Sequence, residues 1–66
     1  MAKDKIFFER VEGGTDPRTK YSIRYFYDLD GNPCDKSVYA KSSIVEYDEL
    51  DQRITETYGL NAAFFS

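Results

Sequence analysis

The chain has 66 residues, a formal net charge of −3, one cysteine and no histidine. A chain this short forms one domain and buries only about 60% of its unfolded surface, so we expect a single domain over residues 1–66 with a small core. One thiol excludes an internal disulfide, and without histidine the usual zinc-ligand sets are excluded as well.

The first segment, Met1–Lys5, is charged and leads directly into a run that reads as a strand, Lys3–Glu12. Neither a signal peptide nor a membrane-spanning segment is recognisable there. We therefore expect a cytoplasmic protein with no membrane contact. Residues 13–20 hold two glycines and a proline without any periodicity, which predicts a long loop.

An aromatic run, Tyr21–Asp28, predicts the second strand, and Asp30-Gly31 follows it. Asp-Gly between two β-rich runs favours a two-residue type I′ hairpin turn. In that register Tyr21, Ile23 and Tyr25 face the core. A four-residue loop keeps this parity, whereas a three- or five-residue loop shifts the returning strand by one residue and brings Tyr39 inside. The returning strand is expected over Cys34–Lys41.

The segment from Ser43 to Tyr58 predicts a helix of about fifteen residues. Ser43 and Glu46 have the spacing of a capping box, and Gly59 stands where a C-cap glycine belongs. An alternative start places Asp48 at the N-cap. Apolar residues recur behind the cap at helical spacing, at Ile44, Tyr47, Leu50, Ile54 and Tyr58.

These elements predict an α+β fold, a three-stranded antiparallel sheet packed on one C-terminal helix in the order β-β-β-α. The tail that follows, Leu60–Ser66, carries Phe64 and Phe65. Two phenylalanines are expected to close the core under the sheet or to sit in an interface.

Catalysis is not expected, because the commonest general base is missing and Cys34 has no histidine to activate it. The neighbouring Asp35 is expected to raise the pKa of the thiol. Asp28–Asn32 has the look of a calcium loop, but its glycine and its twelfth position do not fit the EF-hand pattern. We expect no cofactor and no metal.

Acidic residues are concentrated in the second part of the chain. We expect them to form a partner-binding surface, made of the predicted helix and the hairpin tip, that contacts a basic surface on another protein. The residues of this surface are Asp28, Asp30, Asp35, Glu46, Asp48, Glu49, Asp51 and Glu56.

Two resemblances bear on these expectations. Tyr25–Asn32 resembles one unit of the tyrosine-aspartate repeats of large bacterial shell-forming toxins, which implies a shared hairpin. In size, acidic balance, low cysteine content and expected layout, the whole chain resembles small acidic phage-encoded inhibitors of the anti-CRISPR type. That resemblance implies a non-enzymatic inhibitor that blocks a nucleic-acid-binding site on a host protein.

Two alternatives stay open. Phe7, Arg24, Phe26 and Tyr39 could line an outer sheet face that binds single-stranded nucleic acid by base stacking, although the acidic balance makes nucleic acid a less favoured partner. A structural homodimer could instead bury Phe64, Phe65 and the second sheet face.

Overall fold

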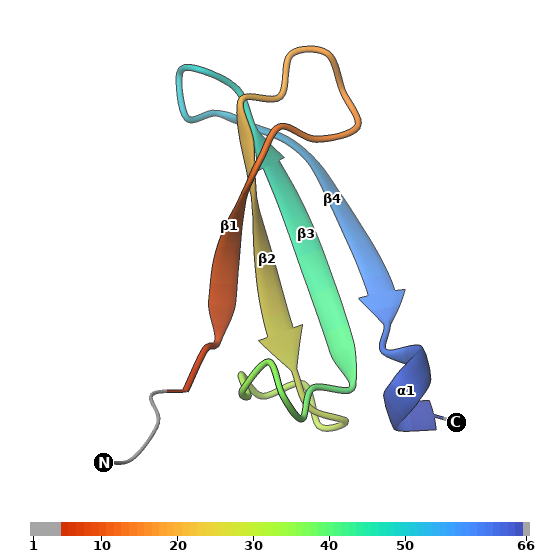
Figure 1. Cartoon of the computed structure of the whole chain (residues 1–66). Helices are drawn as coiled ribbons and strands as arrows, with labels where there is room; N and C mark the ends of the chain where they lie inside the picture. The colour runs from red at the N-terminus through yellow and green to blue at the C-terminus, as the bar shows by residue number, and fades with distance from the viewer. Residues whose placement is uncertain (1–4, 66) are drawn as a thin grey trace.

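The computed structural model describes residues 5–65. Four strands form one antiparallel sheet in the order β1-β2-β3-β4, and a single helical turn follows (Figure 1). The elements are β1 Phe8–Glu12, β2 Tyr21–Tyr27, β3 Lys41–Tyr47, β4 Arg53–Leu60 and α1 Ala62–Phe65.

The predicted helix over 43–58 is wrong, and with it the β-β-β-α fold class. This segment forms the β3–β4 hairpin, in which Ser43 pairs with Tyr58 and Val45 with Glu56. The segment is rich in β-branched and aromatic residues, which favour strands, and Asp48–Gln52 supplies a turn in its middle. The apolar residues of this segment happen to recur at helical spacing, although the segment forms two strands.

The predicted strand Cys34–Lys41 is also wrong. After the first turn the chain makes one bridge, Tyr27 to Pro33, and the Cys34 amide donates to the Phe26 carbonyl. The chain then leaves the sheet and returns as β3, which is the true partner of β2. Pro33 cannot donate a ladder hydrogen bond, and this limits the first pairing to a short stretch.

The first turn has three loop residues rather than the two expected for type I′. The Gly31 amide donates to the Asp28 carbonyl, and the Asp28 amide donates to the Asn32 carbonyl. Gly31 has φ 86°, so this is a type I turn closed by a left-handed residue. The three-residue alternative weighed from the sequence is therefore the correct one.

The turn between β3 and β4 repeats this geometry twenty residues later. The Asp51 amide donates to the Asp48 carbonyl, the Asp48 amide donates to the Gln52 carbonyl, and Asp51 has φ 62°. Tyr-Asp precedes both turns, at Tyr27-Asp28 and Tyr47-Asp48. This recurrence is the sequence signal that identifies the second turn.

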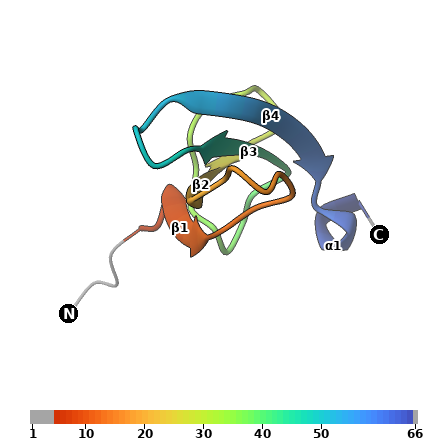
Figure 2. The same cartoon turned by 90° about the horizontal axis from the view of Figure 1, so that it is seen from above.

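The sheet is strongly curved, and loop 13–20 lies on its inner side (Figure 2). Phe26 and Ser22 project from β2 to this concave face and are 0% and 3% exposed. Tyr21, Ile23 and Tyr25 were predicted to face the core, but they project to the convex face and are half-buried. The reason is that no helix covers the convex face, whereas loop residues fold onto the concave one.

Few apolar side chains are fully enclosed. Among residues 5–65 the buried apolar residues are Phe26, Ala40 and Val45. Phe26 packs against Tyr39 with a ring-centroid distance of 4.8 Å, and Tyr39 itself is half-buried in the loop before β3. One curved sheet with loops over one face thus makes only a small core.

We expect Gly31→Ala to lower the free energy of unfolding by about 1 kcal/mol, because a Cβ is strained at positive φ. Gly31→Asn should lose less, since asparagine tolerates the left-handed region. Gly59→Ala is the matched control, because its φ is not positive and an added Cβ would meet its nearest atom at an ordinary 3.5 Å. Urea denaturation of the three variants measures this, and equal losses at both glycines would contradict the turn assignment.

Candidate functional site

The eight acidic residues proposed as one surface do not lie together. Asp28, Asp30 and Asp35 belong to the lower end of the sheet in Figure 1, whereas residues 48–51 form the upper turn. The seven residues of β3 separate these ends by about 20 Å. With the helix absent, the single acidic surface predicted from the sequence is not formed.

Three of these carboxylates hold turns and loops in place. Asp28 accepts from the amides of Asp30 and Asn32, and Asp48 accepts in the same way from Leu50 and Gln52. Asp35 accepts from the Ile6 amide at 2.6 Å and so ties the lower loop to the start of β1. Acid side chains at these positions are explained by turn chemistry.

Two more carboxylates are engaged by side chains of strand residues. Asp51 accepts a hydrogen bond from the Tyr21 hydroxyl at 2.8 Å, which raises the pKa of Tyr21. Glu56 pairs with Arg53 at 3.0 Å and accepts from the Tyr58 hydroxyl. Among the described residues no hydrogen bond or ion pair engages the side chains of Asp30 and Glu49, which lie at opposite ends.

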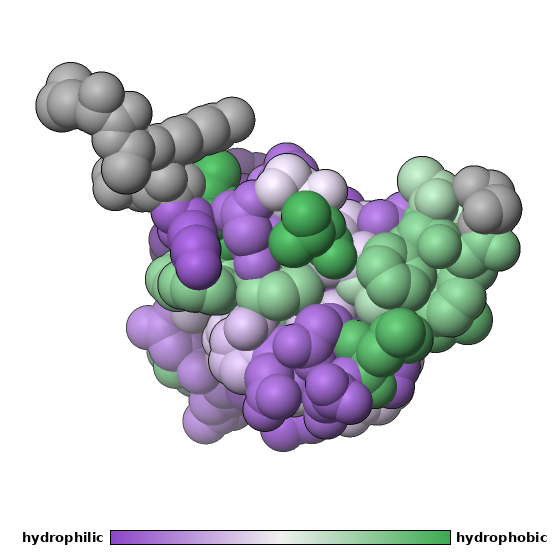
Figure 3. All heavy atoms as spheres, turned by 90° about the horizontal axis from the view of Figure 1, so that it is seen from below, coloured by the Kyte–Doolittle hydropathy of each residue, from purple (hydrophilic) through white to green (hydrophobic). Residues whose placement is uncertain are grey.

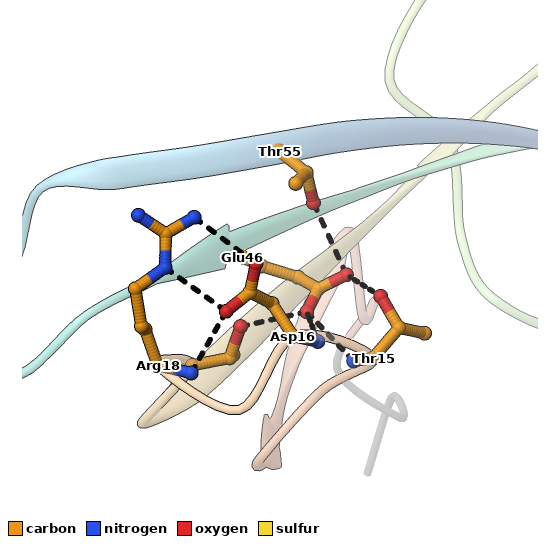
Figure 4. Close-up of polar contacts among 6 residues, drawn as sticks. Thr15, Asp16, Arg18, Glu46 and Thr55 are labelled. Carbon is orange, nitrogen blue, oxygen red and sulfur yellow. Dashed lines mark hydrogen bonds and ion pairs between the residues drawn. The ribbon is translucent and has the colours of Figure 1, made fainter.

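Glu46 is the most enclosed acid, with 2% of its surface exposed. It projects from β3 to the concave face, where loop 13–20 surrounds its carboxylate (Figure 4). The amide and hydroxyl of Thr15 and the hydroxyl of Thr19 each donate to it at 2.8 Å, and the Thr55 hydroxyl donates at 3.1 Å. The hydrogen bonds from Thr19 and Thr15 lower the pKa of Glu46 to about 2. We call this arrangement the Glu46 cage.

Gly14 and Asp16 complete the loop around the cage. A Cβ on Gly14 would collide with the Glu46 carboxylate oxygen and stand 2.6 Å from the Thr19 methyl carbon, so a side chain at this position would displace the carboxylate. Asp16 forms two side-chain contacts with Arg18, at 3.1 and 3.0 Å, and this interaction lowers the pKa of Asp16. The cage is saturated by protein donors, which indicates that Glu46 anchors the loop and is not a partner-binding residue.

The residues considered for base stacking are engaged inside the molecule. Phe26 is 0% exposed, and the Arg24 guanidinium donates to the Tyr39 hydroxyl at 2.7 Å while lying over the rings of Phe26 and Tyr39. Arg24 also faces Glu9 at 3.9 Å. Phe7 is 42% exposed, and Arg24 and Tyr39 are partly exposed, but Phe26 is not available to stack on a base.

Cys34 is half-buried beside the first turn. Partial burial and the charges of Asp28 and Asp35 raise the pKa of its thiol, which confirms the direction expected from the sequence. A thiol in this state is a poor nucleophile. Within residues 5–65 no group of three or more acidic, cysteine or histidine side chains could hold a metal ion.

Exposed apolar side chains gather at the lower end instead. Val38 is 61% exposed, Phe64 45% and Phe65 52%, and the two rings meet edge to face at 5.3 Å. Val38 and Phe64 line the same shallow hollow with Tyr39 and Asn61. We call Val38, Phe64 and Phe65 the lower apolar patch. Figure 3 shows apolar residues gathered at the α1 side of this end.

The patch is fixed to the sheet by Asn61. Its amide donates to the Ala40 carbonyl at 2.9 Å, and its side chain donates to the Tyr39 carbonyl at 2.9 Å and accepts from the Ala63 amide. Phe64 and Phe65 therefore do not close the core, which was one of the two placements expected for them. The other placement, an interface, is the one that their exposure supports.

No helix among residues 5–65 has the length and apolar character needed to cross a membrane. Comparisons with protein-family models, with curated proteins and with solved structures gave no match. The cytoplasmic location, the absence of catalysis and the resemblance to anti-CRISPR inhibitors therefore stay predictions.

We expect the stability of the protein to fall as the pH drops from about 4.5 to about 2, because protonation of Glu46 breaks the cage. The folded-state pKa is depressed, so the stabilisation is complete above the unfolded pKa and is lost on acidification. Glu46→Gln should melt at a lower temperature than the wild type at neutral pH, and this difference should shrink toward pH 2. Parallel melting curves at all pH values would contradict the role of the carboxylate.

Gly14→Ala should open the cage, because the added methyl group displaces the carboxylate from its donors. We expect a lower melting temperature and faster amide exchange at Thr15 than in the wild type. The same substitution made in Glu46→Gln should have a smaller effect, since the two residues act on one contact. Additive losses in this double-mutant cycle would show that Gly14 acts elsewhere.

Proposed function

We propose that this chain is a non-enzymatic protein-interaction module that binds its partner through the lower apolar patch. The observation that carries the proposal is the exposure of both phenylalanines of α1 at a single end of the molecule. Exposed apolar clusters on small proteins mark contact surfaces, and aromatic residues are enriched at the centres of such surfaces.

The scaffold around the patch supports a preformed contact. Asn61 holds α1 against the end of the sheet by three hydrogen bonds, so the rings need not be ordered at the moment of binding. Ordering side chains on association costs affinity, and a preorganised surface avoids part of that cost. Val38, on a different loop, widens the patch beyond α1.

One acidic side chain at the lower end of the sheet, Asp30, favours a basic group at the rim of the partner. Asp30 lies in the lower loop, and its carboxylate is not used by any hydrogen bond or ion pair among the described residues. A rim charge of this kind affects the rate of association more than the affinity. A basic host protein blocked by a phage inhibitor, the role implied by the anti-CRISPR resemblance, fits within this proposal.

Reversing charge at Asp48, Glu49 and Asp51 would be a poor test, because Asp48 and Asp51 build the upper turn. Substitutions of exposed apolar residues leave the turns intact. Leu50 is 73% exposed at the opposite end and offers a matched control.

We expect the double variant Phe64→Ser/Phe65→Ser to lose the partner, while Leu50→Ser keeps it. Tagged proteins are incubated with a lysate of the host cell, and the bound proteins are quantified by mass spectrometry. A genuine partner should be recovered about tenfold less with the double variant, the size of effect expected for a contact hot spot. If no protein depends on Phe64 and Phe65 while circular dichroism shows both variants folded, the proposal is wrong.

A further inference from the structure

The sheet ends in two edges that no other described strand covers, β1 and β4. Backbone groups alternate in direction along an edge strand, so half of them point away from the sheet. On β4 the Asn61 amide bonds to Ala40, which makes 57, 59 and 61 the inward-pointing positions. Glu56, Tyr58 and Leu60 therefore present their amides and carbonyls outward.

The same reasoning gives the outward positions of β1. The Phe26 amide donates to the Phe7 carbonyl, so 7, 9 and 11 point toward β2. Phe8, Arg10 and Glu12 then point outward. The Ile6 carbonyl, of the same parity, indeed accepts a hydrogen bond from outside the sheet, from the Lys36 amide.

The two edges are complementary in direction. Four strands in an antiparallel meander leave β1 and β4 antiparallel to each other. When β4 of one copy lies beside β1 of a second copy, the new pair is therefore antiparallel as well. We call this contact between β4 of one copy and β1 of the other the seam. With an odd number of strands in the sheet, the two strands of the seam would run parallel.

The side chains select one register for such a seam. With Tyr58 opposite Phe8 of the second copy, Glu56 lies opposite Arg10 and Leu60 opposite Ile6. The outward backbone groups of Phe8 and Arg10 can pair with those of Tyr58 and Glu56. The amide and carbonyl of Ile6 are already bonded to Asp35 and Lys36, so only the side chains of Ile6 and Leu60 meet there. A shift by two residues in one direction sets Glu56 against Glu12, and a shift in the other sets it against Phe8. Only one register pairs opposite charges and apolar side chains together.

We propose that two copies of this chain close an eight-stranded antiparallel barrel, with β4 of each copy paired to β1 of the other. Figure 2 shows the curvature that such closure needs, with β1 and β4 at the two ends of a curved sheet. A contact between two different edges forms a closed ring when repeating the rotation between copies leads back to the first copy. With two copies, both edges of each sheet are then paired.

The concave face supplies what the interior of such a barrel requires. Eight strands enclose a space that side chains just fill, so loop 13–20 of each copy has to lie at the upper end of the strands, where Figure 1 shows it. Phe26 and Tyr39 already lie on this face, and Val11 and Ile44, 49% and 36% exposed in one copy, would be covered by closure. The barrel thereby enlarges a core that a single copy leaves small. Phe8 and Tyr58, which are 60% and 75% exposed, lie on the convex face and would cover each other on the outside of each seam.

This proposal is independent of the lower apolar patch, because the seam pairs Glu56 with Arg10 and Tyr58 with Phe8. Sedimentation of the wild type from about 1 to 100 μM covers the range in which moderate interfaces associate. We expect a species of twice the 7.7 kDa chain mass to dominate at the upper end. A protein that stays monomeric throughout would overturn the proposal.

The register is tested by exchanging charges across the seam. Glu56→Arg alone places arginine against arginine in both seams, and Arg10→Glu alone places acid against acid. Each single variant should dimerise about tenfold more weakly, from repulsion and lost attraction at two seams. An equimolar mixture of the two variants forms a heterodimer in which both seams pair opposite charges, and it should regain the affinity of the wild type.

The mixture of the two variants distinguishes a changed contact between copies from a changed contact within one chain. Arg10 also contacts Glu12 and Tyr21, and Glu56 contacts Arg53, but mixing cannot repair those contacts. Tyr58→Pro gives a second variant, because the amide that it removes points away from β3. It should abolish the dimer and leave the chain folded by circular dichroism. No rescue in the mixture, or a dimer that tolerates Tyr58→Pro, would show that the edges do not pair as proposed.

Discussion

The carboxylate of Glu46 is the constraint on which the upper half of the molecule depends. It is 2% exposed, and its oxygens are occupied by donors from Thr15, Thr19 and Thr55. A buried charge is tolerated when hydrogen bonds replace its hydration. Because most of these donors belong to loop 13–20, the requirement to satisfy one carboxylate folds a long, glycine-containing loop onto the concave face. The loop also covers Ser22 of β2, whose hydroxyl donates to the Gly13 carbonyl.

Acidic residues in this chain are thus mainly structural. Asp28 and Asp48 close equivalent turns, Asp35 ties the lower loop to β1, and Glu46 holds the upper loop. Carboxylates that accept several internal hydrogen bonds are poorly placed to meet a basic partner, since a new contact would compete with the fold. The surfaces left for association are the lower apolar patch and the two sheet edges.

The small size of the core is a reason for both surfaces to associate. A chain of 66 residues with three buried apolar side chains among its described residues gains little from internal packing. Exposed edge strands are usually blunted by prolines, lysines or bulges, yet β4 runs for eight residues with no proline or lysine. Its one irregularity lies near the upper turn. Pairing of β4 with another strand satisfies the exposed backbone groups of this edge and adds apolar contact at the same time.

The sequence alone determined the local features: the strand at Tyr21–Tyr27, the loop over 13–20 and the existence of a turn at Asp28–Asn32. These depend on neighbouring residues, such as Gly31 for positive φ. Only the tertiary structure decided that 43–58 forms a hairpin, because helical and strand periodicities overlap in a segment this short and cross-strand partners such as Thr57 for Ile44 are distant along the chain. It also decided that Phe26 is buried and Glu46 caged, since both follow from loops that fold back from remote parts of the sequence.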